Sequence, residues 1–297
     1  MKLEQIGLVG YGEVGKIFSA GLLGKPGVHQ VSAWDLKFAD PATREAETGH
    51  AIQAGVCVQA SLRSLCESSA LVISAVTASN TLAVAREAAA HLRPSALFLD
   101  LNSASPGAKQ QCAALIEAAG AHYVEAGVMT SVPPYGIKVP MMLGGTRAAE
   151  LAQTLNAWGM DAKAVSERIG VASATKMCRS VMIKGLEALV IESFTTARHY
   201  GVEDAMLATL AETFPSIDWP RQGAYFFSRV AQHGKRRAEE MVEAANTVRE
   251  SGFEPFMAAA IASKHDWMAQ QATGAAFKDL DGASPWQAYA DRLVKRS

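Results

Sequence analysis

Apolar and polar positions in the first half of the chain follow two alternating patterns. Short runs rich in β-branched residues, typical of strands, are separated by alanine-rich segments with helical spacing. This alternation predicts a parallel β-sheet covered by helices. We expect strands over Gln5–Val9, Gln30–Trp34, Leu71–Ala75, Leu97–Leu101, His122–Glu125 and Lys138–Leu143. We expect the intervening helices over Val14–Leu23, Ser61–Glu67, Asn80–His91, Ala108–Ala119 and Arg147–Trp158.

The strand pattern ends near Gly170, and the rest of the chain has helical spacing. The stretch Ala172–Tyr200 contains no proline and one glycine, Gly185. As a single helix it would be about 40 Å long, which suits a helix that joins two domains. Further helices, punctuated by prolines, are expected over Glu203–Phe214, Gln222–His233, Arg236–Ser251, Phe256–Ala272 and Trp286–Lys295. The sequence predicts an α/β domain over residues 1–168 and an all-α domain over residues 169–297.

A glycine-rich turn, Gly10-Tyr11-Gly12-Glu13-Val14-Gly15, follows the first expected strand directly. Gly10 permits the tight turn, Gly12 lets the backbone approach a pyrophosphate, and Gly15 allows the next helix to pack on the strand. That helix, which begins near Glu13 and Val14, presents free N–H groups to the phosphates. We therefore expect a Rossmann-type dinucleotide-binding domain with these residues at the cofactor.

Asp35 stands at the end of the second expected strand, where an acidic side chain can hydrogen-bond a ribose 2′-OH. Asp is also a common turn or cap residue, but the glycine turn favours the cofactor role and with it NAD over NADP. Lys37 weakens that preference because a nearby cation can accept a 2′-phosphate. By position, Val76 and Thr77 are expected along the cofactor, although Val76 is equally suited to the sheet core.

Lys176, Ser180 and Lys184 share one face of the long helix, and Arg179 lies one turn from Lys176. A solvated stripe on an amphipathic helix is the simplest interpretation. The apolar flanks and the absence of an acidic residue before Glu187 favour a second interpretation, in which these cations bind an anion. Cations without a local partner serve to bind an anion from elsewhere, here a small anionic substrate.

The segment Asp100-Leu-Asn102-Ser103-Ala-Ser105-Pro106 lies at the carboxyl end of the expected strand Leu97–Leu101. Ligands of open α/β sheets bind beyond the carboxyl ends of strands, so Asn102 and Ser103 are candidates to contact substrate and nicotinamide. The same residues would also build a capped helix start with proline in its first turn, and both roles are compatible.

These motifs, in this order, resemble the β-hydroxyacid dehydrogenases, a superfamily that includes 3-hydroxyisobutyrate and 6-phosphogluconate dehydrogenases. The resemblance rests on the glycine turn, the Asp-x-x-Ser-x-Ser-Pro segment, Val139-Pro-Met-Met-Leu-Gly-Gly145 and the Lys176 helix. The second half is similar to the branch whose helical domain is catalogued as uncharacterised. The resemblance implies that Lys176 is the catalytic acid/base, that Ser103 lies at the substrate and nicotinamide, and that the protein is a homodimer or larger.

The chain departs from the family pattern at three positions. Ser180 stands where the family usually has Asn, Met129-Thr130-Ser131 replaces a Ser-Gly-Gly turn that grips the substrate carboxylate, and Ala172 replaces a glycine. Thr130 and Ser180 remain expected substrate contacts, and we hypothesise that Arg179 supplies part of the anion recognition. The resemblance also suggests that the basic cluster His233-Gly-Lys-Arg236-Arg237 completes a phosphate site, whereas a solvated helix start is the simpler interpretation.

The predicted function is an NAD(P)-dependent dehydrogenase of a small 3-hydroxy or aldonic acid, with decarboxylation of a 3-keto product left open. An imine reductase and a non-catalytic NAD-binding sensor are the alternatives, and Lys176 counts against the first. Net charge is −1, so we expect neither a nucleic-acid nor a membrane partner. Four cysteines without Cys-x-x-Cys spacing fit a reduced compartment. Seven scattered histidines suggest neither a structural zinc nor a two-histidine metal site. With a strand beginning at Gln5 there is no room for a signal peptide, and we expect a cytoplasmic protein.

Overall fold

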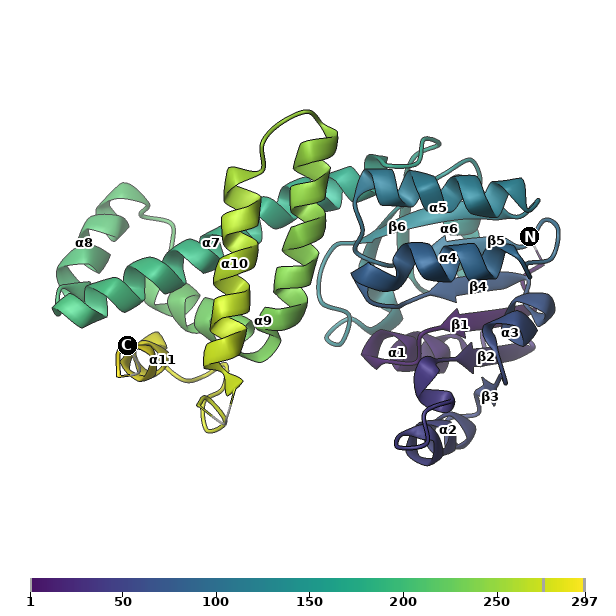
Figure 1. Ribbon diagram of the computed structural model, residues 1–297, viewed down its shortest axis with the longest axis horizontal. Helices are drawn as coiled ribbons and strands as arrows, with labels where there is room; N and C mark the ends of the chain where they lie inside the picture. Colours follow the sequence, from purple (N-terminus) through teal and green to yellow (C-terminus); the bar gives the residue numbers. More distant parts are fainter. Residues whose placement is uncertain (1, 274–275, 296–297) are drawn as a thin grey trace. The chain divides into compact units, whose positions relative to one another are not determined.

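The computed structural model describes residues 2–273 and 276–295. The chain divides into two compact units, the first reaching to Met177 and the second beginning at Cys178. Helix α7 (Val171–Tyr200) begins in the first unit and continues in the second, and it coincides with the long helix predicted from the sequence (Figure 1).

The first unit is built on one eight-stranded sheet with the order β3-β2-β1-β4-β5-β6-β7-β8. Its strands are β1 (Gln5–Val9), β2 (Gln30–Trp34), β3 (Cys57–Val58), β4 (Leu71–Ser74), β5 (Leu97–Asp100), β6 (His122–Val128), β7 (Pro140–Gly144) and β8 (Asp161–Ser166). Neighbouring strands pair in parallel, except that β6 and β7 are antiparallel. The expectation of a parallel sheet is wrong for this pair, because the loop of residues 129–139 returns the chain beside β6 without a crossover helix.

The six predicted strands are confirmed, two with the predicted ends and four with ends shifted by one to three residues. The two-residue strand β3 and the strand β8, in which only Ala162 is buried, were not predicted because neither contains a continuous apolar run. The helices are α1 (Glu13–Leu22), α2 (Arg44–Gln53), α3 (Leu62–Ser68), α4 (Thr81–Ala89), α5 (Pro106–Ala118) and α6 (Ala148–Ala157). Of these only α2 was missed, since it is polar and buries a single residue, Ala51.

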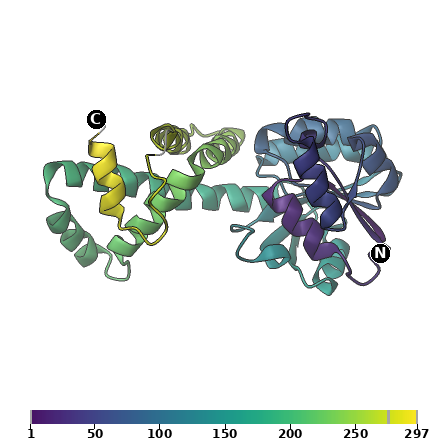
Figure 2. The same ribbon diagram turned by 90° about the horizontal axis from the view of Figure 1, so that it is seen from below.

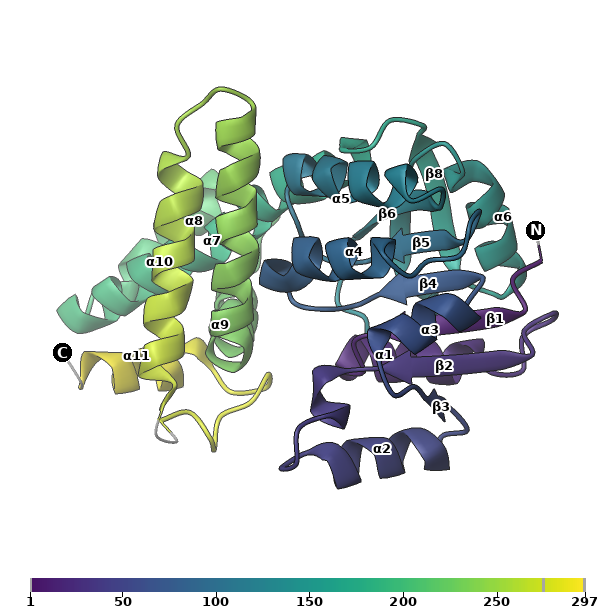
Figure 3. The ribbon, with the colours of Figure 1, turned by 45° about the vertical axis from the view of Figure 1, so that its right-hand side comes forward.

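Helices lie on both faces of the sheet (Figures 2 and 3). On one face α3, α4 and α5 pack against strand residues such as Val72 and Phe98. On the other, α1 and α6 pack against residues such as Leu8 and Ile73. Strands covered on both faces are apolar at nearly every position, which is why the predicted runs were continuous.

The strand order reverses direction at β1. The chain passes from β1 to β2 and β3 on one side, and then crosses to β4 on the other side of β1. A crevice forms at the carboxyl ends of strands at such a switch point, and ligands of open α/β sheets bind there. The glycine turn that follows β1 lies at this position.

The second unit is helical. After α7 it contains α8 (Glu203–Thr213), α9 (Trp219–Glu250), α10 (Phe256–Gln271) and α11 (Trp286–Val294). Helices α9 and α10 run side by side (Figures 1 and 3), and a core of Phe194, Phe227, Met268 and Trp286 joins them to α7 and α11. The two helices predicted on either side of His233 form one helix, α9, with a kink at His233, where φ is −131°.

The described residues lack a membrane-spanning helix and a cluster of metal-binding side chains. No helix in the described part of the chain is long and apolar enough to span a membrane. Residues 2–273 and 276–295 also contain no group of three or more His, Cys, Asp or Glu side chains arranged to hold a metal ion.

Candidate active site

The glycine turn has the geometry of a dinucleotide cradle. Gly10 has φ +93°, and a side chain there would overlap the carbonyl of Ala75 on the neighbouring strand. A side chain at Gly15 would overlap the carbonyl of Gly10. By contrast, a Cβ added at Gly12 would meet no described atom within 4 Å, so the backbone is open on the side where a pyrophosphate would lie.

Helix α1 begins directly after this turn, with Gly12 as its N-cap. The Gly12 N-cap makes no side-chain cap hydrogen bond, and the first N–H groups of a helix have no partner within the helix. Glu13 is exposed and Val14 is half-buried at the start of α1. The open cradle and the uncapped helix start together fit the diphosphate of a dinucleotide.

Asp35 follows β2 and lies beside the glycine turn. Its carboxylate accepts a hydrogen bond from the Tyr11 N–H at 2.6 Å and another from the Lys37 N–H at 2.9 Å. The Lys37 ammonium group lies 3.6 Å from a Glu47 carboxylate oxygen, and Lys16 pairs with the other oxygen of Glu47 at 2.7 Å. Hydrogen bonding by Lys16 lowers the pKa of Glu47, which keeps this acidic partner charged beside Lys37.

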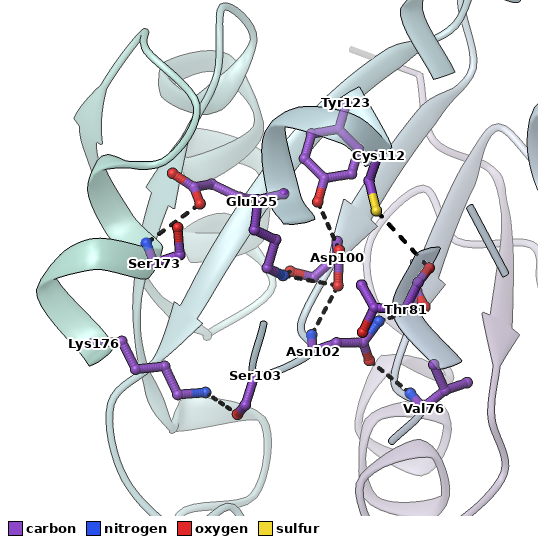
Figure 4. A network of polar contacts seen from close by, with 12 residues as sticks. Val76, Thr81, Asp100, Asn102, Ser103, Cys112, Tyr123, Glu125, Ser173 and Lys176 are labelled. Carbon is purple, nitrogen blue, oxygen red and sulfur yellow. Dashed lines mark hydrogen bonds and ion pairs between the residues drawn. The ribbon is translucent and has the colours of Figure 1, made fainter. Parts of the chain in front are cut away.

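Asn102 bridges the ends of β4 and β5 (Figure 4). Its Oδ1 accepts from the Val76 N–H at 2.7 Å, and its Nδ2 donates to Ser74 Oγ at 3.0 Å. Asn102 is 4% exposed, and both ends of its amide are engaged within the protein. The half-buried Val76 and the exposed Thr77 follow β4 at the same edge of the sheet.

A buried ion pair lies beneath this edge. Asp100, the last residue of β5, pairs with the ammonium group of Lys109 at 2.9 Å and accepts the Tyr123 hydroxyl at 2.6 Å and the Asn102 N–H at 2.8 Å (Figure 4). All four residues are at most 4% exposed. Burial, followed by the charge of Asp100, raises the pKa of Tyr123, so this hydroxyl remains a donor. The network fixes the backbone that leads from β5 to Ser103.

Lys176 and Ser103 meet at the end of this segment. The Lys176 ammonium nitrogen lies 2.6 Å from Ser103 Oγ (Figure 4). Ser103 follows β5, two residues before Ser105 caps α5, while Lys176 lies in the second turn of α7. The two side chains are both half-buried and come from segments 73 residues apart. The structure therefore brings together the two residues that the sequence analysis placed at the chemical centre.

The start of α7 rests on a buried carboxylate. Glu125 of β6, which is fully buried, accepts hydrogen bonds from the backbone N–H groups of Gly170 at 2.7 Å, Ala172 at 3.0 Å and Ser173 at 3.3 Å. Three of the donors that a helix start leaves unpaired are thus satisfied by one negative charge. Sequence reasoning missed Glu125, although a single acidic residue within an apolar strand is a signal that it needs buried partners.

The other predicted substrate residues occupy different environments. Thr130 is exposed in the loop that follows β6. Arg179, in the second unit, is exposed as well. Ser180 and Lys184 are buried there, and Lys184 donates to Ser180 Oγ at 3.3 Å.

The prediction that the cations of α7 lack a local partner is wrong for Lys184. Glu240 of α9 approaches its ammonium group to 2.8 Å, a contact between helices that the spacing along α7 alone could not indicate.

In the basic cluster, Lys235 and Arg236 are exposed just after the kink at His233, as a solvated helix start requires. The expectation is wrong for Arg237, which is buried and forms an ion pair with Glu187. Burial raises the pKa of Glu187, against the opposing effect of Arg237.

Two of the four cysteines lie where burial disfavours the thiolate. Cys66 and Cys112 are buried, and burial raises the pKa of each thiol to about 12. Cys57 and Cys178 are exposed, and all four are free thiols. A nucleophilic role is therefore excluded for the two buried thiols, since only the thiolate reacts.

Comparison with known proteins gives two family matches. Residues 5–166 match the family described as the NAD binding domain of 6-phosphogluconate dehydrogenase. Residues 197–268 match a domain of unknown function, DUF1932.

Three solved structures are similar over nearly the whole chain. A conserved hypothetical protein from Sinorhizobium meliloti is 37% identical with a TM-score of 0.79, covering 100% of this chain and 97% of that one. A 3-hydroxyisobutyrate dehydrogenase from Mycobacterium tuberculosis with L-serine is 20% identical with a TM-score of 0.72, covering 98% and 99%. A reductive aminase from Aspergillus terreus with NADPH and ethyl levulinate is 18% identical with a TM-score of 0.57, covering 97% and 99%. The last two similarities show the fold alone.

Proposed function

The chain belongs to the family of the NAD binding domain of 6-phosphogluconate dehydrogenase, which makes it a dehydrogenase-like NAD(P)-dependent oxidoreductase, and we propose that it oxidises or forms a small 3-hydroxy or aldonic acid. The observation that carries the proposal is the 2.6 Å contact between the Lys176 ammonium nitrogen and Ser103 Oγ at the carboxyl edge of the sheet. A proton-transfer group and a hydroxyl lie there beside the switch point at which a dinucleotide binds.

The cofactor residues in this proposal are those of the cradle. Gly10, Gly12 and Gly15 shape the turn, and the N–H groups of Glu13 and Val14 at the start of α1 would hold the diphosphate. The Asp35 carboxylate is available to a ribose hydroxyl. Because Lys37 is already paired with Glu47, a 2′-phosphate would meet the charge of Asp35 without a free cation from Lys37, which supports NAD over NADP. When bound, the nicotinamide accepts or donates the hydride.

The proposed chemistry of the chain's own residues is proton transfer at one atom. In the oxidative direction, the Lys176 amine accepts the proton of the substrate hydroxyl, and in the reductive direction Lys176 returns it. Ser103 orients Lys176 and hydrogen-bonds the substrate. Asn102 acts indirectly. Its side chain hydrogen-bonds the Val76 N–H and Ser74 Oγ and so fixes the end of β4, where the cofactor is proposed to bind. A 3-keto acid product is able to lose CO₂, and Lys176 is placed to polarise its ketone.

Because Lys176 must be a neutral amine to accept the proton, the negative charge of the substrate requires another cation and further hydrogen-bond donors. Thr130 and Arg179 are exposed and are the proposed contacts to it. Ser180 and Lys184 were predicted as contacts too, but the pairing of Lys184 with Glu240 makes them weaker candidates than Arg179. Replacing Arg179 by Ala should raise the KM for the acid and leave the Kd for NAD unchanged, and an unaltered KM would remove Arg179 from the site.

We also propose that the protein forms a homodimer through α7. Met182, Leu186 and Leu189 lie on one stripe of this helix and are 67%, 37% and 55% exposed. Exposed apolar patches of this kind mark protein interfaces. A second copy of the chain is the partner expected from the family resemblance. Light scattering should give twice the mass of 31.5 kDa for wild type and a monomer for Met182→Glu/Leu189→Glu, whereas a monomeric wild type would contradict this proposal.

The four free cysteines support a reducing compartment such as the cytoplasm as the place where the protein works. Nothing else in this proposal depends on that location.

The proposed function is tested by a cofactor-reduction screen at an absorbance wavelength specific for the reduced nicotinamide. NAD and NADP are each offered with a panel of 3-hydroxy and aldonic acids, and CO₂ release is followed for every acid that is oxidised. The proposal expects turnover with one class of acid and a preference for NAD. Tight NAD binding with no turnover of any acid would contradict it. Imines are then the next substrates to test, and inactivity toward those as well would favour an NAD-binding sensor.

A further inference from the structure

The contact between Lys176 and Ser103 joins two segments, and the backbone of each segment donates hydrogen bonds to a buried carboxylate. Asp100 and Glu125 are register partners on the neighbouring parallel strands β5 and β6, and both are fully buried. Asp100 organises the backbone that leads to Ser103, through the Asn102 N–H and Lys109. Glu125 organises the backbone that leads to Lys176, through the first N–H groups of α7.

Glu125 differs from Asp100 in having no cation as partner among the described residues. Its described hydrogen bonds are to the backbone of Gly170, Ala172 and Ser173. The positive end of the α7 dipole therefore takes the place of a counter-ion for this buried charge. A buried carboxylate in such a position is stable only while the helix start stays against it, so charge and helix position are coupled.

Two glycines let β6 and β7 approach the helix closely enough for this arrangement. A Cβ on Gly144 would lie 2.6 Å from Oε1 of Glu125, in contact with the carboxylate. A Cβ on Gly127 would lie 2.9 Å from the carbonyl oxygen of Ala172 and 3.5 Å from the Cβ of Lys176. We call Glu125, Gly127 and Gly144 the α7 seat. Because the seat touches the first turn of α7 and the base of the Lys176 side chain, a shift of the helix against it would move Lys176.

We propose that Glu125 is a positioning residue: within the α7 seat, its carboxylate fixes the first turn of α7 so that Lys176 reaches Ser103. The consequence for turnover rests on the function proposed above, whereas the placement of Lys176 does not. Helix rise is about 1.5 Å per residue, so even a shift smaller than one residue would lengthen the 2.6 Å contact beyond hydrogen-bond distance.

The test compares Glu125→Gln and Glu125→Asp with wild type and with Glu203→Gln as a matched control. Glu203 is the first residue of α8, in the second unit, and pairs with Arg198, so its replacement also removes a carboxylate from a helix start. Two measurements require no substrate. Amide exchange is followed by mass spectrometry over residues 168–176, and competitive acetylation compares Lys176 with the exposed Lys163 in the same sample.

In Glu125→Gln, amide exchange over this segment should accelerate about tenfold or more, since the neutral side chain loses charge-assisted bonds to the helix start. Acetylation of Lys176 relative to Lys163 should rise, because the contact with Ser103 is released. Glu125→Asp should bring the amide exchange and the Lys176 acetylation part of the way back to wild-type values. Glu203→Gln should change neither of these two quantities. If Glu125→Gln fails to fold, Glu125→Asp and Gly144→Ala, which crowds the carboxylate, provide the same two measurements.

The kinetic arm uses the best acid from the cofactor-reduction screen. Glu125→Gln should lower kcat on the order of 10²-fold, the effect of misplacing a catalytic group by about 1 Å, while KM stays near its wild-type value. Unchanged exchange and unchanged Lys176 acetylation in Glu125→Gln would overturn the proposal. If wild type oxidises no acid, the proposed function fails, and exchange and acetylation still decide whether Glu125 positions Lys176.

Discussion

The sheet unit and the helical unit both bury charged side chains, and they connect them differently. In the sheet unit, Asp100 and Glu125 accept hydrogen bonds from the backbone of the segments that carry Ser103 and Lys176. In the helical unit, Glu187 of α7 is bonded to the Arg237 side chain of α9, and Lys184 to Glu240. The first arrangement fixes backbone at the edge of the sheet, whereas the second joins one helix to another.

This difference has an energetic consequence. A pair made of two side chains can be replaced as a unit by apolar residues of similar size, because no polar group is left behind. A carboxylate that also serves backbone N–H groups and a hydroxyl cannot be removed in this way, since those donors would remain buried and unpaired. Buried charge in the sheet unit is therefore expected to be indispensable, and that in the helical unit to be replaceable.

The largest expected effect is that of Lys109→Met in the sheet unit. The substitution leaves the Asp100 carboxylate buried without its cation, which should lower the free energy of unfolding by about 3–5 kcal/mol. Denaturant unfolding at neutral pH measures this value. Lys163→Met, at an exposed lysine, is the control and should cost little. A loss near zero for Lys109→Met would mean that the pair contributes nothing to stability.

The comparison itself is tested by two double replacements. Glu187→Leu/Arg237→Met should be more stable than either single variant, because it removes both charges of a side-chain pair. Asp100→Leu/Lys109→Met should be no more stable than Lys109→Met, since the Tyr123 hydroxyl and the Asn102 N–H each lose an acceptor at a cost of about 1–3 kcal/mol. The same denaturant titration measures all variants. If both double variants regained the same stability relative to their single variants, the two units would not differ in how replaceable their buried charges are.

The next effect is the pH dependence of the helical unit's stability. His265 is fully buried, and burial together with Arg237 and Lys184 lowers its pKa from 6.5 to about 3, while Glu240 acts in the opposite direction. Below pH 6.5 the unfolded chain binds a proton that the folded chain does not, so the free energy of unfolding falls as the pH is lowered toward 3. At pH 5 this loss should be about 2 kcal/mol.

The measurement is the difference in unfolding free energy between pH 7 and pH 5, with His265→Met compared with wild type. The variant should lack this part of the pH dependence, and His29→Gln, at an exposed histidine, should retain it. The raised pKa of Glu187 changes stability in the opposite sense, because the folded state holds that proton more tightly than the unfolded chain. Both variants keep Glu187, so its contribution cancels. Identical pH dependence in wild type and His265→Met would contradict the prediction.

The smallest effect concerns a charge at the rim of the sheet unit. Asp35→Asn should weaken NAD binding about tenfold, by loss of a charge-assisted hydrogen bond to the ribose, and should narrow the preference over NADP. Fluorescence titration with the reduced cofactors measures both constants. Asp40→Asn is the matched control, because Asp40 is an exposed carboxylate that likewise accepts a backbone N–H nearby. Unaltered binding of both cofactors in Asp35→Asn would place the ribose elsewhere.

The sequence predicted more of the sheet than of the contacts beneath it. Continuous apolar runs and the glycine turn placed β1, α1 and the long helix α7 closely, because these features are local. The antiparallel return of β7 was not predictable from periodicity, since a buried strand looks the same in either direction. The family resemblance placed Lys176 and Ser103 at one site, but their direct contact was not predicted.

Partners from distant segments account for what was missed. Glu125 receives the start of α7 from 45 residues away, and the cation of Asp100 comes from the next helix. The environment of Lys184 depends on Glu240, which lies on α9. Lys184 therefore has no acidic neighbour along its own face of α7, but it has one on another helix. A lone charge inside an apolar strand was the one local signal available, and it marked Glu125.

The central claim is that Lys176 transfers the proton while the cradle binds the cofactor. Lys176→Met preserves the length of the side chain and removes the amine, so it is the most direct variant to compare with wild type. With the best acid, kcat/KM should fall by about 10²–10⁴-fold, while the Kd for NAD from titration calorimetry stays unchanged. Turnover at the wild-type rate in Lys176→Met would contradict the claim.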